Sequence, residues 1–333
     1  EFRTVDNSGD IKATLLDAMG NGVEKSLDVN ENVLNPASTN YWTASKQIPD
    51  HTARKVFSMG SGNTPFEFKG AFSSLPVDVQ AALKTGKDKD RIPTDSRFVD
   101  YLRGKDPVSD AQSRVFRQRL SPIGAIVNAP PLLMGDEDDL EYNLTGDVSG
   151  KNLYAAYRAQ IKASSASLFV ATNAGAVHAF TADKGEELAA FMPRRSMTKL
   201  VDQANINSGF SYALDGPITR NDIFTGTQWN QVAIGTGANG NLWRFDLRGD
   251  PSTWKVSYGK PLFTTKDNRP IYGAPAWQAH PKGGFVVIVA TGILLEDNDL
   301  ADTSTRESIY GIWDPTSAAG QEKSAFDTVL PSA

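Results

Sequence analysis

The sequence predicts an all-β protein of the propeller class, because one pattern of strand, tight turn and strand returns along the chain. A β-branched run leads into a Gly/Asn turn, and an apolar or aromatic run follows and ends on an acidic or polar turn. Repeats of this kind at intervals of tens of residues are typical of β-propellers, whose blades bury their faces against one another. The copies lie at residues 168–185, 232–246 and 286–314, with a weaker copy at 2–15.

The first part of the chain predicts β-hairpins with long loops over residues 1–60, and a change to helical spacing follows. Leu75, Val79 and Leu83 recur on one helical face. We therefore predict short helical insertions in a β scaffold, near residues 75–104 and 194–204.

The rest of the chain is mainly β in its pattern. Strands are expected within residues 115–134, including 126–128 and 132–134, and again from residue 229 onward. One further helix is predicted at 154–162. Alternating aromatic residues in the later strands are interpreted as core between blades rather than as a ligand cage. We expect residues 1–333 to form one propeller domain.

Composition excludes several classes of function. Of the 333 residues, 22% are charged and the net charge is −5, so no basic patch dominates and nucleic acid is not an expected partner. The absence of cysteine excludes disulfides, thiolate metal sites and cysteine nucleophiles. No apolar run is long enough to predict a membrane span. We interpret both ends as those of a segment of a longer chain.

One acidic loop is a candidate calcium site. Asp297, Asp299 and Asp302 follow a strong strand and offer several carboxylates from one flexible loop, as compact calcium sites do. The loop lacks the central glycine and terminal glutamate of an EF-hand, so a solvated loop without an ion is the alternative. A second acidic cluster is interpreted as a solvated turn because its charges are adjacent; it contains Asp136, Asp138, Asp139 and Glu141.

A second candidate site is an RGD tripeptide. Arg248, Gly249 and Asp250 precede a proline where a strand ends, which predicts an exposed turn that could bind a cell-surface receptor; ordinary turn chemistry is the alternative.

Catalytic motifs are not recognised in the sequence. The three histidines are scattered, and His178 is expected to be a packed, hydrogen-bonded residue of a strand. No nucleophile elbow or Walker loop is present. The glycines of residues 235–240 join two strands rather than a strand and a helix, so a dinucleotide loop is rejected.

Several stretches resemble the PilC/PilY family of type IV pilus tip proteins. Residues 170–193 resemble a signature blade of that family. Weaker matches follow in the same order as in the family, at residues 41–44, 116–128, 240–247 with 261–263, and 290–292 with 309–314. The resemblance implies a modified seven-bladed propeller, complete or incomplete in this segment. From the same resemblance we expect this segment to lack the family's variable, adhesive N-terminal region.

The resemblance also implies a function. It predicts a non-enzymatic pilus biogenesis factor that is exported to the outer membrane, cell surface or pilus tip. Such a factor promotes pilus assembly, opposes retraction, and supports adhesion and twitching motility; its expected partners are minor pilins and a host-cell receptor. The stretch that corresponds to the family's calcium loop, residues 225–232, has no carboxylates, so the calcium prediction at Asp297, Asp299 and Asp302 comes from local chemistry alone.

Two alternatives stay open at this point. Propellers with similar hairpins include quinoprotein dehydrogenases that bind pyrroloquinoline quinone, although these need a central calcium and often a pair of cysteines. A scaffold for outer-membrane assembly is the other alternative.

Overall fold

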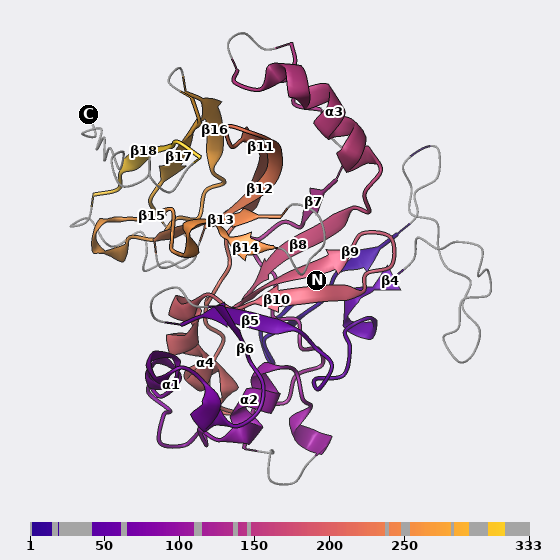
Figure 1. Ribbon diagram of the computed structural model, residues 1–333. Coiled ribbons are helices and arrows are strands. Elements are labelled where there is room, and N and C mark those ends of the chain that lie inside the picture. Colours follow the sequence, from indigo (N-terminus) through magenta and orange to yellow (C-terminus); the bar gives the residue numbers. More distant parts are fainter. Residues whose placement is uncertain are drawn as a thin grey trace.

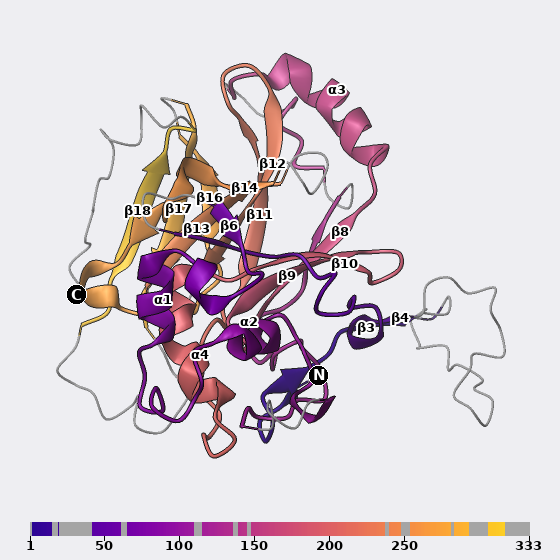
Figure 2. The same ribbon diagram turned by 60° about the horizontal axis from the view of Figure 1, so that its bottom comes forward.

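The protein consists of three main β-sheets that follow one another in space, with helices on one side of the first sheet (Figures 1 and 2). It is seen in a computed structural model. The structure describes residues 2–14, 19, 42–60, 65–109, 115–135, 139–144, 148–236, 240–247, 254–280, 283–292 and 306–316.

The first sheet has six strands in the order β6-β5-β10-β9-β8-β7. Its centre is the hairpin that the sequence predicted, in which Asn173 and Gly175 lie in the turn between β8 and β9. All neighbouring pairs are antiparallel except β10 and β5, which are parallel and join Ala190 to Val56. The strands are β5 (Val56–Met59), β6 (Pro65–Glu67), β7 (Leu132–Met134), β8 (Ser167–Thr172), β9 (Ala176–Thr181) and β10 (Glu187–Phe191).

The second and third sheets are antiparallel and follow chain order, as propeller blades do. The second sheet contains β11 (Ile218–Phe224), β12 (Trp229–Thr236), β13 (Asn241–Asp246) and β14 (Lys255–Val256), and β15 (Phe263–Thr264) also pairs with β13. The third sheet contains β16 (Ala276–Ala279), β17 (Phe285–Ala290) and β18 (Ile309–Asp314).

The middle sheet buries both of its faces. Because successive side chains of a strand point to opposite faces, Ala233 packs toward the first sheet with Phe169. Its neighbour Ile234 packs toward the third sheet with Val287 and Tyr310. All eight residues of β12 are therefore buried.

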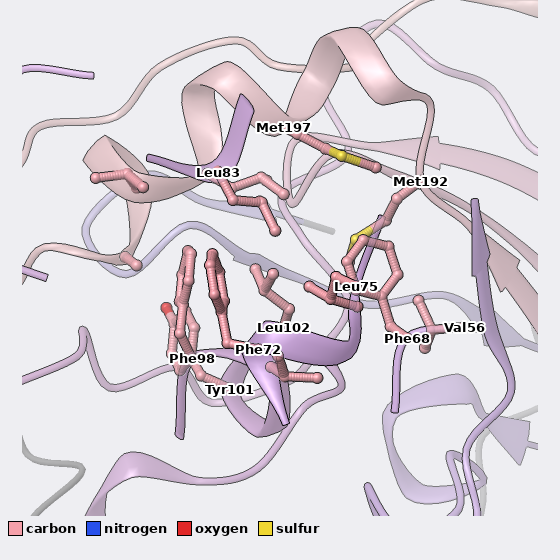
Figure 3. Close-up of a cluster of buried hydrophobic side chains, with 14 of the residues drawn as sticks. Val56, Phe68, Phe72, Leu75, Leu83, Phe98, Tyr101, Leu102, Met192 and Met197 are labelled. Atoms are coloured by element: carbon pink, nitrogen blue, oxygen red, sulfur yellow. The ribbon is translucent and has the colours of Figure 1, made fainter. Parts of the chain in front are cut away.

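Three short helices cover the first sheet on the side away from the second sheet: α1 (Val77–Leu83), α2 (Ser96–Leu102) and α4 (Met197–Ala204). Figure 3 shows their shared core, where Leu83, Phe98 and Met197 lie with Val56 of β5. The side chain of Asp95 caps α2 by accepting a hydrogen bond from the Arg97 backbone N–H at 2.9 Å. Both segments that were predicted to be helical contain helices, and their standing as insertions in a propeller stays a prediction.

A longer helix, α3 (Lys151–Lys162), lies apart from the other three and packs at the far end of the second sheet (Figure 1). Tyr154 and Tyr157 lie three residues apart on its buried face and pack against Trp229 of β12. The predicted helix at 154–162 is confirmed, and it begins one turn earlier than expected.

Two sequence predictions were wrong. Residues 2–15 do not form one hairpin: β1 (Phe2–Arg3) pairs with β2 (Ser8–Gly9), and β3 (Lys12–Ala13) pairs with β4 (Trp42–Thr43). The Asp6 carboxylate accepts hydrogen bonds from the backbone N–H and the hydroxyl of Ser8, which closes a tighter turn than the sequence suggested.

Residues 126–128 are not a strand either. The backbone N–H groups of Val127 and Asn128 point to a buried carboxylate instead of a neighbouring strand. The Asp215 side chain accepts from Val127 N at 3.2 Å and from Asn128 N at 2.9 Å, and it also accepts from the Asn128 side chain.

The fold is thus mostly β, with 33% strand, in agreement with the all-β prediction. The strand pairings within the described residues form no closed sheet, and the seven-bladed arrangement stays a prediction. In the described part of the chain, no helix is long and apolar enough to cross a membrane.

Replacing Asp215 by Ala should destabilise the protein by about 3 kcal/mol, because the backbone N–H groups of Val127 and Asn128 would lose their buried acceptor. Urea unfolding followed by circular dichroism measures this change. Asp139→Ala is the control, since Asp139 also accepts a backbone hydrogen bond, from Glu141, but in an exposed turn. Equal stability losses for the two variants would contradict the role assigned to Asp215.

Candidate binding site

The predicted ligand residues cannot be placed. Asp297, Asp299 and Asp302 of the calcium prediction, and Arg248, Gly249 and Asp250 of the receptor prediction, lie outside the described residues. Of the second acidic cluster, Asp139 and Glu141 are described, and the Asp139 carboxylate accepts a hydrogen bond from the Glu141 N–H, as a solvated turn would. Within the described ranges, no three His, Asp or Glu side chains form a group that could hold a metal ion.

The clearest hollow in the described structure is an apolar cavity of about 470 Å³ between the first and second sheets. Strands of both sheets provide its walls. The lining residues used below are Phe57, Ser58, Pro65, Phe169, Val177, Ala179, Ala189, Phe191, Ile218, Ala233, Phe245, Trp254 and Lys255.

Burial of the lining residues distinguishes a deep end from a mouth. Phe169, Ala179 and Ala233 are buried and mark the deep end, where β8 and β9 approach β12. Phe57, Pro65 and Lys255 are exposed and mark the mouth, with Phe57 at 37% exposure. The two sheets therefore diverge from a closed end toward an open one.

Aromatic pairs hold the walls together across the cavity. The rings of Phe169 and Trp254 lie 5.2 Å apart between centroids, and those of Phe191 and Phe245 lie 5.5 Å apart, edge to face. Each pair joins the first sheet to the second. Such pairs contribute about 0.5–1.5 kcal/mol beyond the area they bury, so the cavity is bounded by ordered contacts.

Alanines create the space between these aromatic pairs. Ala179 of β9, Ala189 of β10 and Ala233 of β12 all line the cavity. Their side chains are too short to meet across the gap. Small side chains at these three strand positions thus contribute to the volume. The pairings of β8 with β9 and of β12 with β13 are regular around it, whereas the pairing of β10 with β9 shifts register between Glu187 and Ala189.

A buried ion cluster lies on the other face of the same strands. His178 alternates along β9 with the cavity residues Val177 and Ala179, so its side chain points away from the cavity. The cluster consists of Arg54, Glu187 and His178: two Arg54 nitrogens donate to the Glu187 carboxylate at 2.5 and 2.7 Å, and His178 Nδ1 lies 2.8 Å from it. The prediction that His178 is packed and hydrogen-bonded is confirmed.

Charges in the cluster shift the ionisation of its members. Burial alone would raise the pKa of Glu187, but the Arg54 guanidinium and the hydrogen bonds from Arg54 and His178 lower it to about 2. Burial lowers the pKa of His178, against the opposing effect of Glu187. At neutral pH the cluster therefore holds an ion pair, Arg54 with Glu187, beside a neutral imidazole.

A second buried group connects the middle sheet to the third. Arg244 of β13 donates to the Asp314 carboxylate of β18 and to the Tyr258 hydroxyl, both at 2.6 Å. The Tyr258 hydroxyl donates to Asp314 at 2.7 Å. Arg244 alternates with the cavity residue Phe245, so β13 presents an apolar face to the first sheet and a charged contact to the third.

A third buried group fixes α3. The Asp222 carboxylate of β11 accepts hydrogen bonds from the hydroxyls of Tyr154 at 2.7 Å and Tyr157 at 2.8 Å. Burial raises the pKa of Asp222, although the two tyrosine hydrogen bonds oppose this. Helix α3 is thus held against the second sheet by the hydroxyls of Tyr154 and Tyr157 and by the packing of their rings on Trp229.

Sequence reasoning missed the cavity. The aromatic residues of the later strands that were interpreted as core between blades include Phe245 and Trp254, which lie between two sheets and line the cavity. The one signal available was the presence of alanine at inward positions of neighbouring strands, Ala179 and Ala189 among them, where larger residues usually fill the core.

Stacked, mainly antiparallel sheets with an apolar cavity between two of them place the described chain in the class of layered β proteins. Residues 207–328 match the family model described as the PilY1 beta-propeller domain. A type IV pilus biogenesis factor PilY1 homolog of Xylella fastidiosa (strain Temecula1) is 35% identical over 49% of this chain and 13% of its own length. The type IV pilus biogenesis factor PilY1 of Pseudomonas aeruginosa (strain PAK) is 24% identical over 83% of this chain and 36% of its own length.

The chain is thus similar to PilY1-family type IV pilus factors, in agreement with the resemblance found in the sequence. The chain thus spans 36% of the length of the Pseudomonas aeruginosa relative and 13% of the length of the Xylella fastidiosa relative. Among solved structures, the Pseudomonas aeruginosa PilY1 C-terminal domain is similar at 20% identity and a TM-score of 0.25, over 56% of this chain and 65% of that one.

Acid should destabilise the protein through Glu187. The pKa of Glu187 is about 2 in the folded protein, whereas an unperturbed glutamate has a pKa of 4.5. As pH falls below about 4.5, Glu187 is therefore protonated in the unfolded chain before it is protonated in the folded protein, which favours unfolding. We expect a loss of about 3 kcal/mol between pH 4.5 and 2 in urea unfolding.

Glu187→Gln should lack this acid-dependent loss and be less stable at pH 7 by about 3–5 kcal/mol, since Arg54 keeps a buried charge without its partner. Glu186→Gln is the control, because Glu186 is exposed and adjacent. An unchanged acid profile in Glu187→Gln would show that other groups cause the loss.

Proposed function

We propose that this protein is a type IV pilus biogenesis factor and that the stacked sheets act as its non-enzymatic docking platform. The observation that carries the proposal is the match of residues 207–328 to the PilY1 beta-propeller domain. Relatives named type IV pilus biogenesis factor PilY1 support it over 83% of the chain.

The arrangement of the sheets supports a propeller for this platform. The first sheet packs on the second and the second on the third. On the outward face of the third sheet, Ile288 is 40% exposed and Ile309 is 49% exposed. An apolar face of this kind fits the packing of a further sheet, as in the modified seven-bladed propeller, into which the helices near 75–104 and 194–204 would be inserted.

In this proposal the protein is exported and works at the pilus tip, the outer membrane or the cell surface. There it binds minor pilins, promotes assembly and opposes retraction, and supports adhesion and twitching motility. The RGD residues Arg248, Gly249 and Asp250 are the proposed contact with a host receptor. Calcium bound by Asp297, Asp299 and Asp302 is the proposed regulator.

Deletion of the gene in its own bacterium should remove pili from the cell surface and abolish twitching. The measurement is pilin in the sheared surface fraction, with spread of the colony under agar. If the protein opposes retraction, surface pili return when the retraction motor is deleted as well. Normal piliation in the single deletion would overturn the proposal, as would quinone absorbance with dye-linked alcohol oxidation by the purified protein, which the dehydrogenase alternative predicts.

Calcium should bind the purified protein with micromolar affinity, and the double variant Asp297→Ala, Asp299→Ala should lose this binding, because a carboxylate loop gathers the oxygen ligands that calcium needs. Isothermal calorimetry measures both. The matched control removes two carboxylates from the other acidic loop, as Asp136→Ala, Asp138→Ala, and should bind calcium like the unaltered protein. An absence of heat in the unaltered protein would remove calcium from the proposal.

A further inference from the structure

The cavity between the first and second sheets has the size of a small-molecule site. Its volume is about 470 Å³, within the range of roughly 300–1,000 Å³ typical of ligand pockets. A cavity of this size between packed sheets lacks the van der Waals contacts that normally fill a protein core. A ligand that restores these contacts would therefore stabilise the folded protein.

The lining determines which chemistry can enter. It is apolar except for two side chains, Ser58 and Lys255. The Ser58 hydroxyl is buried and already donates to the Met192 carbonyl at 2.6 Å. Lys255 is exposed at the mouth, and no described carboxylate lies within ion-pair distance of it. One cation at the entrance thus accompanies an apolar interior.

A peptide or a sugar fits this lining poorly. A peptide would bring an N–H and a C=O group with each residue, and each of these costs free energy when buried without a partner. The backbone groups of β8, β9 and β12, which lie in the interior of their sheets, are paired with neighbouring strands. A hydrocarbon chain makes no such demand, and a negative head group can remain at the mouth beside Lys255.

We propose that this cavity binds the hydrocarbon chain of a free fatty acid, with the carboxylate beside Lys255 and the chain between the aromatic pairs Phe169–Trp254 and Phe191–Phe245. The ring contacts of both pairs and the small side chains of Ala179 and Ala189 define the path of the chain. This binding is separate from the pilus role and does not depend on it.

The first test is a series of saturated fatty acids from eight to fourteen carbons, below their micelle concentrations, titrated calorimetrically into the full-length protein. Burying one more CH₂ group should lower Kd about fourfold, until the chain fills the cavity and Kd stops falling. No saturable binding, or a Kd that does not depend on chain length, would overturn the proposal.

Variants test the position of the chain. Ala179→Leu and Ala189→Leu fill the cavity and should raise Kd at least tenfold, whereas Ala156→Leu, on the exposed face of α3, should not change it. Thermal unfolding of each variant reports whether it is folded. If the filling variants do not fold, quenching of Trp254 fluorescence by 12-bromododecanoate in the unaltered protein, reduced in Trp254→Phe, tests the same position; quenching that Trp254→Phe leaves unchanged would contradict it.

The head group has its own test. Lys255→Gln should weaken dodecanoate binding about 1.5- to 5-fold, as expected for one exposed ion pair, and leave dodecanol binding unchanged. Anionic phospholipid vesicles distinguish the source of the chain. Cosedimentation of the protein with the vesicles, without binding of free dodecanoate, would overturn the proposal of a free fatty acid.

Discussion

The middle sheet must bury both of its faces, and the rest of the structure depends on that constraint. Along β12, alternate side chains serve different neighbours: Ala233 contacts the first sheet, while Ile234 contacts the third. A shift of one residue in the pairing of β12 would exchange these two sets and mismatch both interfaces at once. The register of the second sheet therefore fixes the position of its neighbours on both sides.

Buried ion pairs make this apolar packing more specific, because each charged group has a defined partner. The Arg54–Glu187–His178 cluster ties the inner strands of the first sheet, and Arg244 with Asp314 ties the second sheet to the third. Ion pairs of this kind contribute little net stability compared with apolar residues, but breaking one is costly. These ion pairs therefore destabilise alternative strand pairings, in which a buried charge would lack its partner, more than they stabilise the native one. The cavity lies between strands whose opposite faces carry these contacts.

Much of this architecture could be predicted from the sequence, because the signals were local. The strand at 309–314 and the helices within residues 75–104 follow from periodicity. The parallel pairing of β5 with β10 could not be predicted, since it joins residues far apart in the chain. Arg54 and Glu187 belong to residue types that are usually exposed, and only their partners make burial possible. The cavity depends on side-chain sizes across two sheets, which no single strand reveals.

The parallel pairing of β5 with β10 also constrains the order in which the strands of the first sheet can pair. Strand β5 pairs with β6 locally but gains its second neighbour only when β10 exists, and the hydrogen bond from Ser58 to Met192 spans 134 residues. A chain that emerges from its N-terminus first must hold the β5–β6 hairpin with one edge unpaired while more than a hundred residues follow. Contacts of such separation slow folding, and an open strand edge invites pairing with other chains. The β5–β6 hairpin is thus open to such pairing until β10 takes its place beside β5.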